Sequence, residues 1–198
     1  MKNKILLILI LIYLNCLGYK GAGVIPYAIK DGKLYFLLGI FSDQNFSRDH
    51  KKLFSYSSSY FGGMKKPEDN EKPYFTASRE VSEQLLFIFN PDIILKKGNK
   101  IELKKTKTFD TFYQKIKHLN APKVEVEGVY IYFVQISYCA QIYSSIWHRG
   151  IYDFPYHKRL LDLKWIPMEE LLNYLVSDKL TDLATQIKNE KIFDKLLI

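Results

Sequence analysis

The chain has 198 residues, of which 47% are hydrophobic, so it is long enough and apolar enough to form one domain with a core. Its formal net charge of +8 favours anionic partners such as phosphorylated ligands, nucleic acid or an acidic membrane surface, although lysines scattered over a solvated surface give the same charge. The two cysteines, Cys16 and Cys139, argue against a disulfide scaffold, and their spacing excludes a zinc-binding module.

Residues 1–20 differ in composition from the rest of the chain. Lys2 and Lys4 precede the apolar run ILLILILIYL, and small or polar residues follow it. This order is typical of a secretory signal peptide, and the run is short for a membrane-spanning helix, which needs ~20 residues. We therefore predict an exported protein, secreted or periplasmic, with cleavage after Gly18 and one domain over residues 21–198. An uncleaved membrane anchor and a buried first strand are the alternatives.

From residue 21 onward the pattern predicts strands interrupted and followed by helices. Two apolar runs flank Asp31-Gly32, which is a strong signal for a hairpin turn. Residues 42–60 are polar and serine-rich, which predicts a loop. The later predicted elements are a helix within 61–89, two short strands within 93–109, a long strand over 124–136, a loop over 144–160, a strand over 161–167, and helices over 168–180 and 181–198.

The stretch Phe61–Phe89 carries the clearest chemistry. Gly62-Gly63 opens it, and an acidic loop leads into a helical pattern. Spacings of three and four residues form an apolar face from Tyr74, Ala77, Val81, Leu85 and Ile88. They form a polar face from Glu80, Glu83 and Gln84. Side-chain oxygens arranged in this way suit a hard cation such as Mg2+ or Mn2+, and a solvated amphipathic helix is the plainer alternative.

The order of these features resembles the Nudix hydrolases, whose motif is G-x5-E-x7-R-E-U-x-E-E-x-G-U, with U a bulky aliphatic residue. Gly63 matches the first glycine and Glu71 the next acidic position. After seven intervening residues, Arg79-Glu80-Val81 and then Glu83 match the helix. The end of the strand at Trp165-Ile166-Pro167, followed by Glu-Glu-Leu-Leu, is also typical of the family. The resemblance spans roughly residues 21–178.

The resemblance implies an α/β (α+β) fold, with a mixed β-sheet sandwiched between helices. It implies metal-dependent hydrolysis, with Mg2+ or Mn2+, of a nucleoside diphosphate linked to another group. The metal ligands would be Glu80, Glu83, Gln84 and a backbone carbonyl at Gly63. Arg79 would orient the carboxylates through an ion pair with Glu71.

Loop residues complete the predicted site. The resemblance implies a catalytic base whose position varies within the family and which is often an acidic residue from the loop before the last strand; Asp153 is the candidate, and a turn aspartate is the alternative. Aromatic and cationic side chains suited to a nucleobase and a phosphate occur at Trp147, Arg149 and Tyr152. Glu125 and Glu127, on the long predicted strand, either reach the site or lie on an exposed sheet face.

Three positions depart from the family pattern. Seven residues separate Gly63 from Glu71 where the motif has five, and Leu86 replaces a glycine. Gln84 stands where the motif has its second glutamate of a pair. A neutral amide cannot offset the charge of a cation, so the alternative function is a catalytically impaired Nudix-fold protein that binds a phosphorylated ligand or a partner. A basic exported protein that engages nucleic acid or membrane is a third reading, but the sequence carries no specific nucleic-acid signal.

Overall fold

A computed structural model describes residues 19–46, 52–89, 107–139, 160–177 and 180–197. Within these ranges the strands are β1 (Gly21–Lys30), β2 (Lys33–Phe46), β3 (Lys52–Ser59), β4 (Phe61–Met64), β5 (Lys123–Val126), β6 (Val129–Gln135) and β7 (Leu160–Pro167). The helices are η1 (Pro67–Asp69), α2 (Pro73–Phe89), α3 (Lys107–His118), α5 (Met168–Ser177), α6 (Thr181–Asn189) and α7 (Ile192–Leu196).

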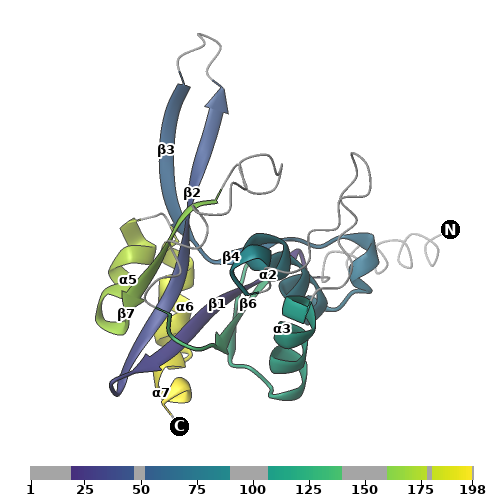
Figure 1. Cartoon of the computed structure of the whole chain (residues 1–198), viewed down its shortest axis with the longest axis vertical. Helices are drawn as coiled ribbons and strands as arrows, with labels where there is room; N and C mark the ends of the chain where they lie inside the picture. The colour runs from purple at the N-terminus through teal and green to yellow at the C-terminus, as the bar shows by residue number, and fades with distance from the viewer. Residues whose placement is uncertain (1–18, 47–51, 90–106, 140–159, 178–179, 198) are drawn as a thin grey trace, which may run out of the picture.

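One mixed sheet joins the seven described strands, and β1 lies at its centre (Figure 1). Strand β1 pairs with β6 in parallel on one edge. On its other edge it pairs antiparallel with β4 near its start and with β2 near its end. Strand β2 pairs with both β3 and β7, and β5 pairs with β6. The mixture of parallel and antiparallel pairs confirms the predicted fold class.

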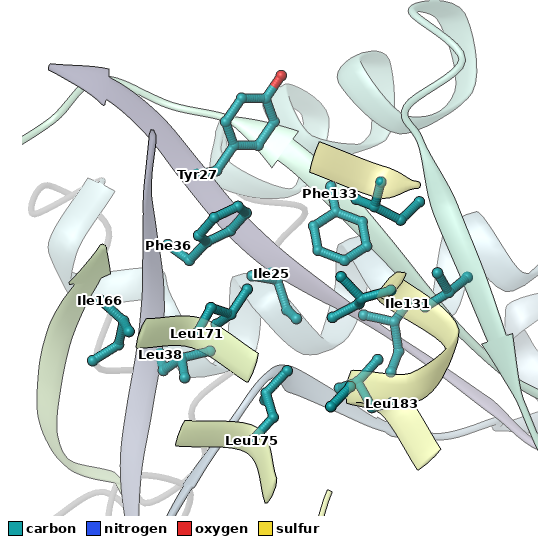
Figure 2. Close-up of a cluster of buried hydrophobic side chains, with 14 of the residues drawn as sticks. Ile25, Tyr27, Phe36, Leu38, Ile131, Phe133, Ile166, Leu171, Leu175 and Leu183 are labelled. Atoms are coloured by element: carbon teal, nitrogen blue, oxygen red, sulfur yellow. The ribbon is translucent and has the colours of Figure 1, made fainter. Parts of the chain in front are cut away.

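Helices cover both faces of this sheet, and each face has its own core. Side chains of β1 alternate, so Ala22 and Val24 face α2 and α3, whereas Ile25 and Tyr27 face α5, α6 and α7. Figure 2 shows the second core, in which strand residues such as Ile25 meet Leu171 and Leu175 of α5. The sheet is therefore sandwiched between two helical layers, as the resemblance implied.

The predicted first hairpin is confirmed, and the following region is where the prediction was wrong. Asp31 and Gly32 form the β1–β2 turn, both with positive φ (51° and 73°), which is what a type I′ turn requires. The described residues of the range 42–60 are not a loop: β2 continues to Phe46, and β3, from Lys52 to Ser59, pairs with it; residues 47–51 lie outside the described residues. This hairpin extends beyond the helices (Figure 1). Backbone hydrogen bonds can hold a polar, serine-rich segment in a ladder, so its composition concealed the strands.

Further along the chain the structure corrects two more predictions. The strand expected over 124–136 is a hairpin of β5 and β6, with a turn at Glu127 (φ 51°) and Gly128 (φ 83°). Helix α3 begins at Lys107, inside a region predicted as strand. The remainder of that region, residues 90–106, lies outside the described residues. The predicted strand before Pro167 and the helix after it are confirmed as β7 and α5.

The end of the described chain is two helices where one was predicted. Lys191 has a φ of 49°, and this left-handed residue separates α6 from α7. Among the described helices none is long and apolar enough to cross a membrane. The predicted signal segment before Tyr19 lies outside the described residues. Tyr19 is buried, and the backbone N–H of Lys20 donates to the carbonyl oxygen of Gly128 at 2.8 Å.

Candidate active site

Strand β4 brings two glycines against the polar face of helix α2. Gly62 and Gly63 pair with Gly23 and Ala22 of β1. A Cβ atom placed on Gly63 would lie 2.5 Å from the carboxyl carbon of Glu80, closer than real atoms approach. A side chain at position 63 would displace the Glu80 carboxylate, because that carboxylate rests directly on the strand. This close contact fixes where the polar face of α2 lies.

Arg79 is the centre of the ion pairs, and its principal partner is Asp69. Its Nε and Nη2 atoms donate to the two carboxylate oxygens of Asp69, both at 2.9 Å. Nη2 also donates to the carbonyl oxygen of Met64 at 3.2 Å. The predicted pair with Glu71 is wrong, because Glu71 is exposed and pairs with Lys65 at 2.7 Å. Asp69 is the residue that holds the arginine.

The environment of Asp69 stabilises its charge. The residue is fully buried, and its Oδ2 accepts hydrogen bonds from the Thr76 hydroxyl at 2.6 Å and the Lys66 backbone N–H at 2.9 Å. Burial by itself would raise the pKa of this carboxyl, but the hydrogen bonds from Arg79, Thr76 and Lys66 outweigh burial and hold the pKa below its ordinary value. Asp69 is therefore ionised in the folded protein.

Glu80 and Glu83 lie together beside the same guanidinium. Nη1 of Arg79 donates to Glu80 at 2.5 Å and lies 3.5 Å from both carboxylate oxygens of Glu83. The Nζ atom of Lys66 lies 3.6 Å from Glu83. Burial raises the pKa of Glu80 more than the positive charge of Arg79 lowers it, and the neighbouring charge of Glu83 raises it further. The structure thus brings together Arg79, Glu80 and Glu83, as the sequence predicted.

Gln84 joins this cluster through its amide. The Nε2 atom donates to the carbonyl oxygen of Gly62 at 3.1 Å and to Glu80 at 3.3 Å. The Oε1 atom is buried without a hydrogen-bond partner. The backbone oxygen beside Gln84 is that of Gly62, and the carbonyl ligand at Gly63 stays a prediction. An unpartnered buried oxygen carries a free-energy cost, which a donor or a cation would relieve.

The oxygen atoms of this cluster are of the type that binds one hard divalent ion, but the net negative charge available to bind the ion is small. Two carboxylates, the Gln84 Oε1 atom and the Gly62 carbonyl are the type of ligand that Mg2+ or Mn2+ prefers. Within the described ranges, no group of three or more His, Cys, Asp or Glu side chains is arranged to hold a metal. Asp69, Glu80 and Glu83 face Arg79 and Lys66, so three negative charges meet two positive ones. A cation would meet a formal charge of only −1.

Four predicted site residues lie outside the described residues: Asp153, Trp147, Arg149 and Tyr152. Their roles stay predictions. Of the two strand acids, Glu127 is in the β5–β6 turn, and Glu125 hydrogen-bonds to Tyr130, whose pKa rises as a result. Neither takes part in the hydrogen bonds around Arg79 described above.

The residue that sequence reasoning missed was detectable from spacing. Five residues separate Gly63 from Asp69, which is the motif's own spacing with aspartate in place of glutamate. Nine residues then separate Asp69 from Arg79, so the two-residue extension lies after the acid. Asn70 and Glu71 follow Asp69 with φ values of 53° and 57°, and these left-handed residues accommodate the extra length.

The fold and the site define an α/β protein with an arginine-centred acidic site between a glycine strand and a helix. No family model matches the chain, and no curated protein sequence matches it. Among solved structures it is similar to an Ap4A hydrolase from C. elegans in a binary complex, at 16% identity and a TM-score of 0.42, covering 88% of this chain and 98% of that one.

Two further solved structures are similar to this chain. A MutT/Nudix family protein from Listeria innocua is 14% identical with a TM-score of 0.43, and the match covers 91% of this chain and 98% of that one. The Nudix domain of Shewanella oneidensis NrtR, complexed with ADP ribose, is 15% identical with a TM-score of 0.38, covering 86% of each chain.

Proposed function

We propose that the protein is a metal-dependent hydrolase of nucleoside diphosphate-linked substrates. The observation that carries this proposal is the grouping of the Glu80 and Glu83 carboxylates beside Arg79, with the Gln84 amide bonded to Glu80 and to the Gly62 carbonyl and its own Oε1 atom buried without a partner. The motif resemblance supplies the reaction class. The positive charge of the whole chain agrees with an anionic substrate.

In this proposal the chain's own residues hold and orient the reacting groups. Glu80 and Glu83, with the Gln84 and Gly62 oxygens, would hold one Mg2+ or Mn2+ ion. Such an ion supplies neutralisation of the charge that develops on phosphate oxygens when water attacks phosphorus. Arg79 fixes the two carboxylates in place, and Asp69 fixes Arg79.

The hydrogen bonds that Glu80 already accepts favour a second function, ligand binding without hydrolysis. Its carboxylate accepts hydrogen bonds from both Arg79 and Gln84. Because the Gln84 amide already occupies one carboxylate oxygen, the attraction of Glu80 for a metal ion is reduced. A Nudix-fold protein that binds a phosphorylated ligand without hydrolysing it is the alternative proposal. Both functions use the same cluster of side chains around Arg79 and differ in whether turnover occurs.

The discriminating experiment is hydrolysis of a diphosphate panel by the full chain. The panel contains Ap4A and ADP-ribose, with Mg2+ or Mn2+, and the phosphorylated products are separated and quantified by ion-exchange chromatography. We expect turnover that Glu83→Gln lowers and that the exposed Glu71→Gln control leaves unchanged. Absence of turnover together with absence of Mn2+ binding would refute the hydrolase, and ADP-ribose binding without turnover would establish the alternative.

Gln84→Glu measures how much the missing charge matters. Replacing the amide by a carboxylate adds one negative charge beside Glu80, so Mn2+ should bind more tightly and turnover should rise. Tighter Mn2+ binding with no gain in turnover would show that the site geometry, and not the charge alone, limits hydrolysis.

We also propose that the protein is exported through residues 1–18. The support is the basic, apolar and small-residue order of that segment. Sequencing the N-terminus of the protein recovered outside the cytoplasm tests it. A chain that starts at Tyr19 agrees with the proposal, and a chain that keeps Met1 contradicts cleavage.

A further inference from the structure

Tyr19, just ahead of strand β1, reaches into the site from outside the motif. Its side chain is buried, and its hydroxyl lies 2.9 Å from the Thr76 hydroxyl in helix α2. Two other contacts, one to its ring and one to the backbone of the next residue, support this segment independently of the hydroxyl. The Lys65 Nζ lies 5.3 Å from the centre of the tyrosine ring, and the Lys65 backbone N–H donates to the carbonyl oxygen of Lys20 at 2.9 Å.

The hydrogen bonds from Tyr19 inward have a single direction. Thr76 has one hydroxyl proton and donates it to Asp69 at 2.6 Å. The Tyr19 hydroxyl is therefore the donor to Thr76, because Thr76 has no second proton to give. Tyr19 donates to Thr76, Thr76 donates to Asp69, and Asp69 accepts two bonds from Arg79. Aligned hydrogen bonds in a buried chain strengthen one another.

We propose that Tyr19 and Thr76 are positioning residues that hold Arg79 between Glu80 and Glu83 by fixing the Asp69 carboxylate. This inference deepens the proposed function, on whose site it depends. Without the Thr76 bond, the Asp69 Oδ2 atom keeps the Lys66 N–H and Arg79, but it loses its 2.6 Å hydrogen bond, one of its two donors from helix α2. Arg79 then moves relative to the carboxylates that it orients.

The same chain of contacts connects the start of the folded domain to the site. Tyr19 would be the first residue after the predicted cleavage. A processed protein therefore keeps the whole series of hydrogen bonds from Tyr19 through Thr76 and Asp69 to Arg79, which we call the relay. The Tyr19 ring is held by Lys65, so removal of the hydroxyl alone leaves the packing of the residue in place. Tyr19→Phe is therefore the variant that tests the relay without disturbing the fold.

The experiment measures the solvent exchange of the Arg79 Nε–H by 1H–15N NMR on the full-length protein, with the resonance assigned by its loss in Arg79→Lys. We expect exchange to accelerate at least about tenfold in Thr76→Val and severalfold in Tyr19→Phe, because loss of aligned donors loosens the Asp69–Arg79 pair. Thr76→Ser keeps the hydroxyl and should exchange like the wild type. Tyr113→Phe, which removes a tyrosine hydroxyl that accepts a hydrogen bond from Lys117, is the matched control.

Activity gives a second, separate readout. Tyr19→Phe should lower kcat for a diphosphate substrate with little change in KM, since the substrate is not touched and only the orientation of the carboxylates changes. Unchanged Arg79 exchange in the folded Tyr19→Phe protein would overturn the positioning role. Accelerated exchange in a protein that hydrolyses no diphosphate would uphold the positioning role and refute the proposed hydrolase.

Discussion

The two faces of the sheet are built by different forces. On the face covered by α5, α6 and α7, the buried cluster consists of apolar side chains and one tyrosine (Figure 2). The buried polar side chains of the described residues all belong to the opposite layer: Asp69, Thr76, Ser78, Ser82 and Thr108. One face thus contributes non-directional apolar burial, and the other includes directional hydrogen bonds that fix a site.

Within the polar layer, Ser78 and Ser82 find their hydrogen-bond partners differently from Asp69. Ser78 and Ser82 donate to carbonyl oxygens four residues earlier in α2, so they cost the core little. Asp69 depends on partners from η1 and α2 together. Burial of a charge is tolerated only where such partners are complete, so this layer is sensitive to single changes that the apolar layer does not share.

The largest expected effect is on the apolar face. Phe36 is fully buried, and its ring lies 5.7 Å from that of Phe193 and 6.3 Å from that of Phe133, measured between centroids. Phe36→Ala should lower the free energy of unfolding by about 4 kcal/mol through lost burial and a cavity. Urea denaturation measures it, with the exposed Val176→Ala as control. Altered Mn2+ affinity in the folded variant would show that the two faces are not independent.

The next effect is at Asp69. Asp69→Asn leaves Arg79 without its principal counter-charge and should cost about 3 kcal/mol of stability, whereas Glu71→Gln, an exposed pair, should change it by less than about 0.5 kcal/mol. Because the pKa of Asp69 is lowered in the fold, its contribution is complete above its ordinary value of 3.8 and is lost as pH falls through the folded pKa. Acid titration of stability should therefore be steeper in the wild type than in Asp69→Asn.

A smaller stability effect, with a large effect on activity, is expected at Gly63. The added methyl of Gly63→Ala would meet the Glu80 carboxylate, which is the end of a flexible side chain and can move. The stability cost should be about 1 kcal/mol, while displacement of the carboxylate should lower turnover about 100-fold. In a Glu80→Ala background the same change should have no further effect on turnover, and an additive loss would contradict the contact.

The smallest expected effect is the pH dependence that Glu80 contributes. Its pKa is raised in the fold, chiefly by burial, so the folded protein binds the proton more tightly than the unfolded chain. Stability should fall as pH rises from the ordinary value of 4.5 through the folded pKa, and Glu80→Gln should remove this slope. The difference in denaturation midpoint between the wild type and Glu80→Gln, compared at pH 4 and at pH 7, measures it; a wild-type advantage that does not shrink from pH 4 to pH 7 would contradict the assignment.

The sequence predicted those features that depend on local spacing. Alternation and the Asp31-Gly32 pair predicted the first hairpin, and the spacing of Ala77, Val81 and Leu85 predicted the buried face of α2. The β2–β3 hairpin was missed because backbone pairing between distant residues leaves no mark in a polar composition. At the site, Arg79, Glu80 and Glu83 were predicted together, but Asp69 was passed over in favour of Glu71.

The sequence by itself therefore determined a mixed α/β fold and the helix that carries Glu80, Glu83 and Gln84, because strand and helix periods are read from neighbouring residues. Only the tertiary structure decided which acid pairs with Arg79, which glycine carbonyl faces Gln84, and that Tyr19 reaches Thr76 over 57 residues of sequence. Those contacts depend on where η1, β4 and the start of β1 meet in space. Burial of Asp69 among its donors, which no local pattern encodes, selects it over the exposed Glu71.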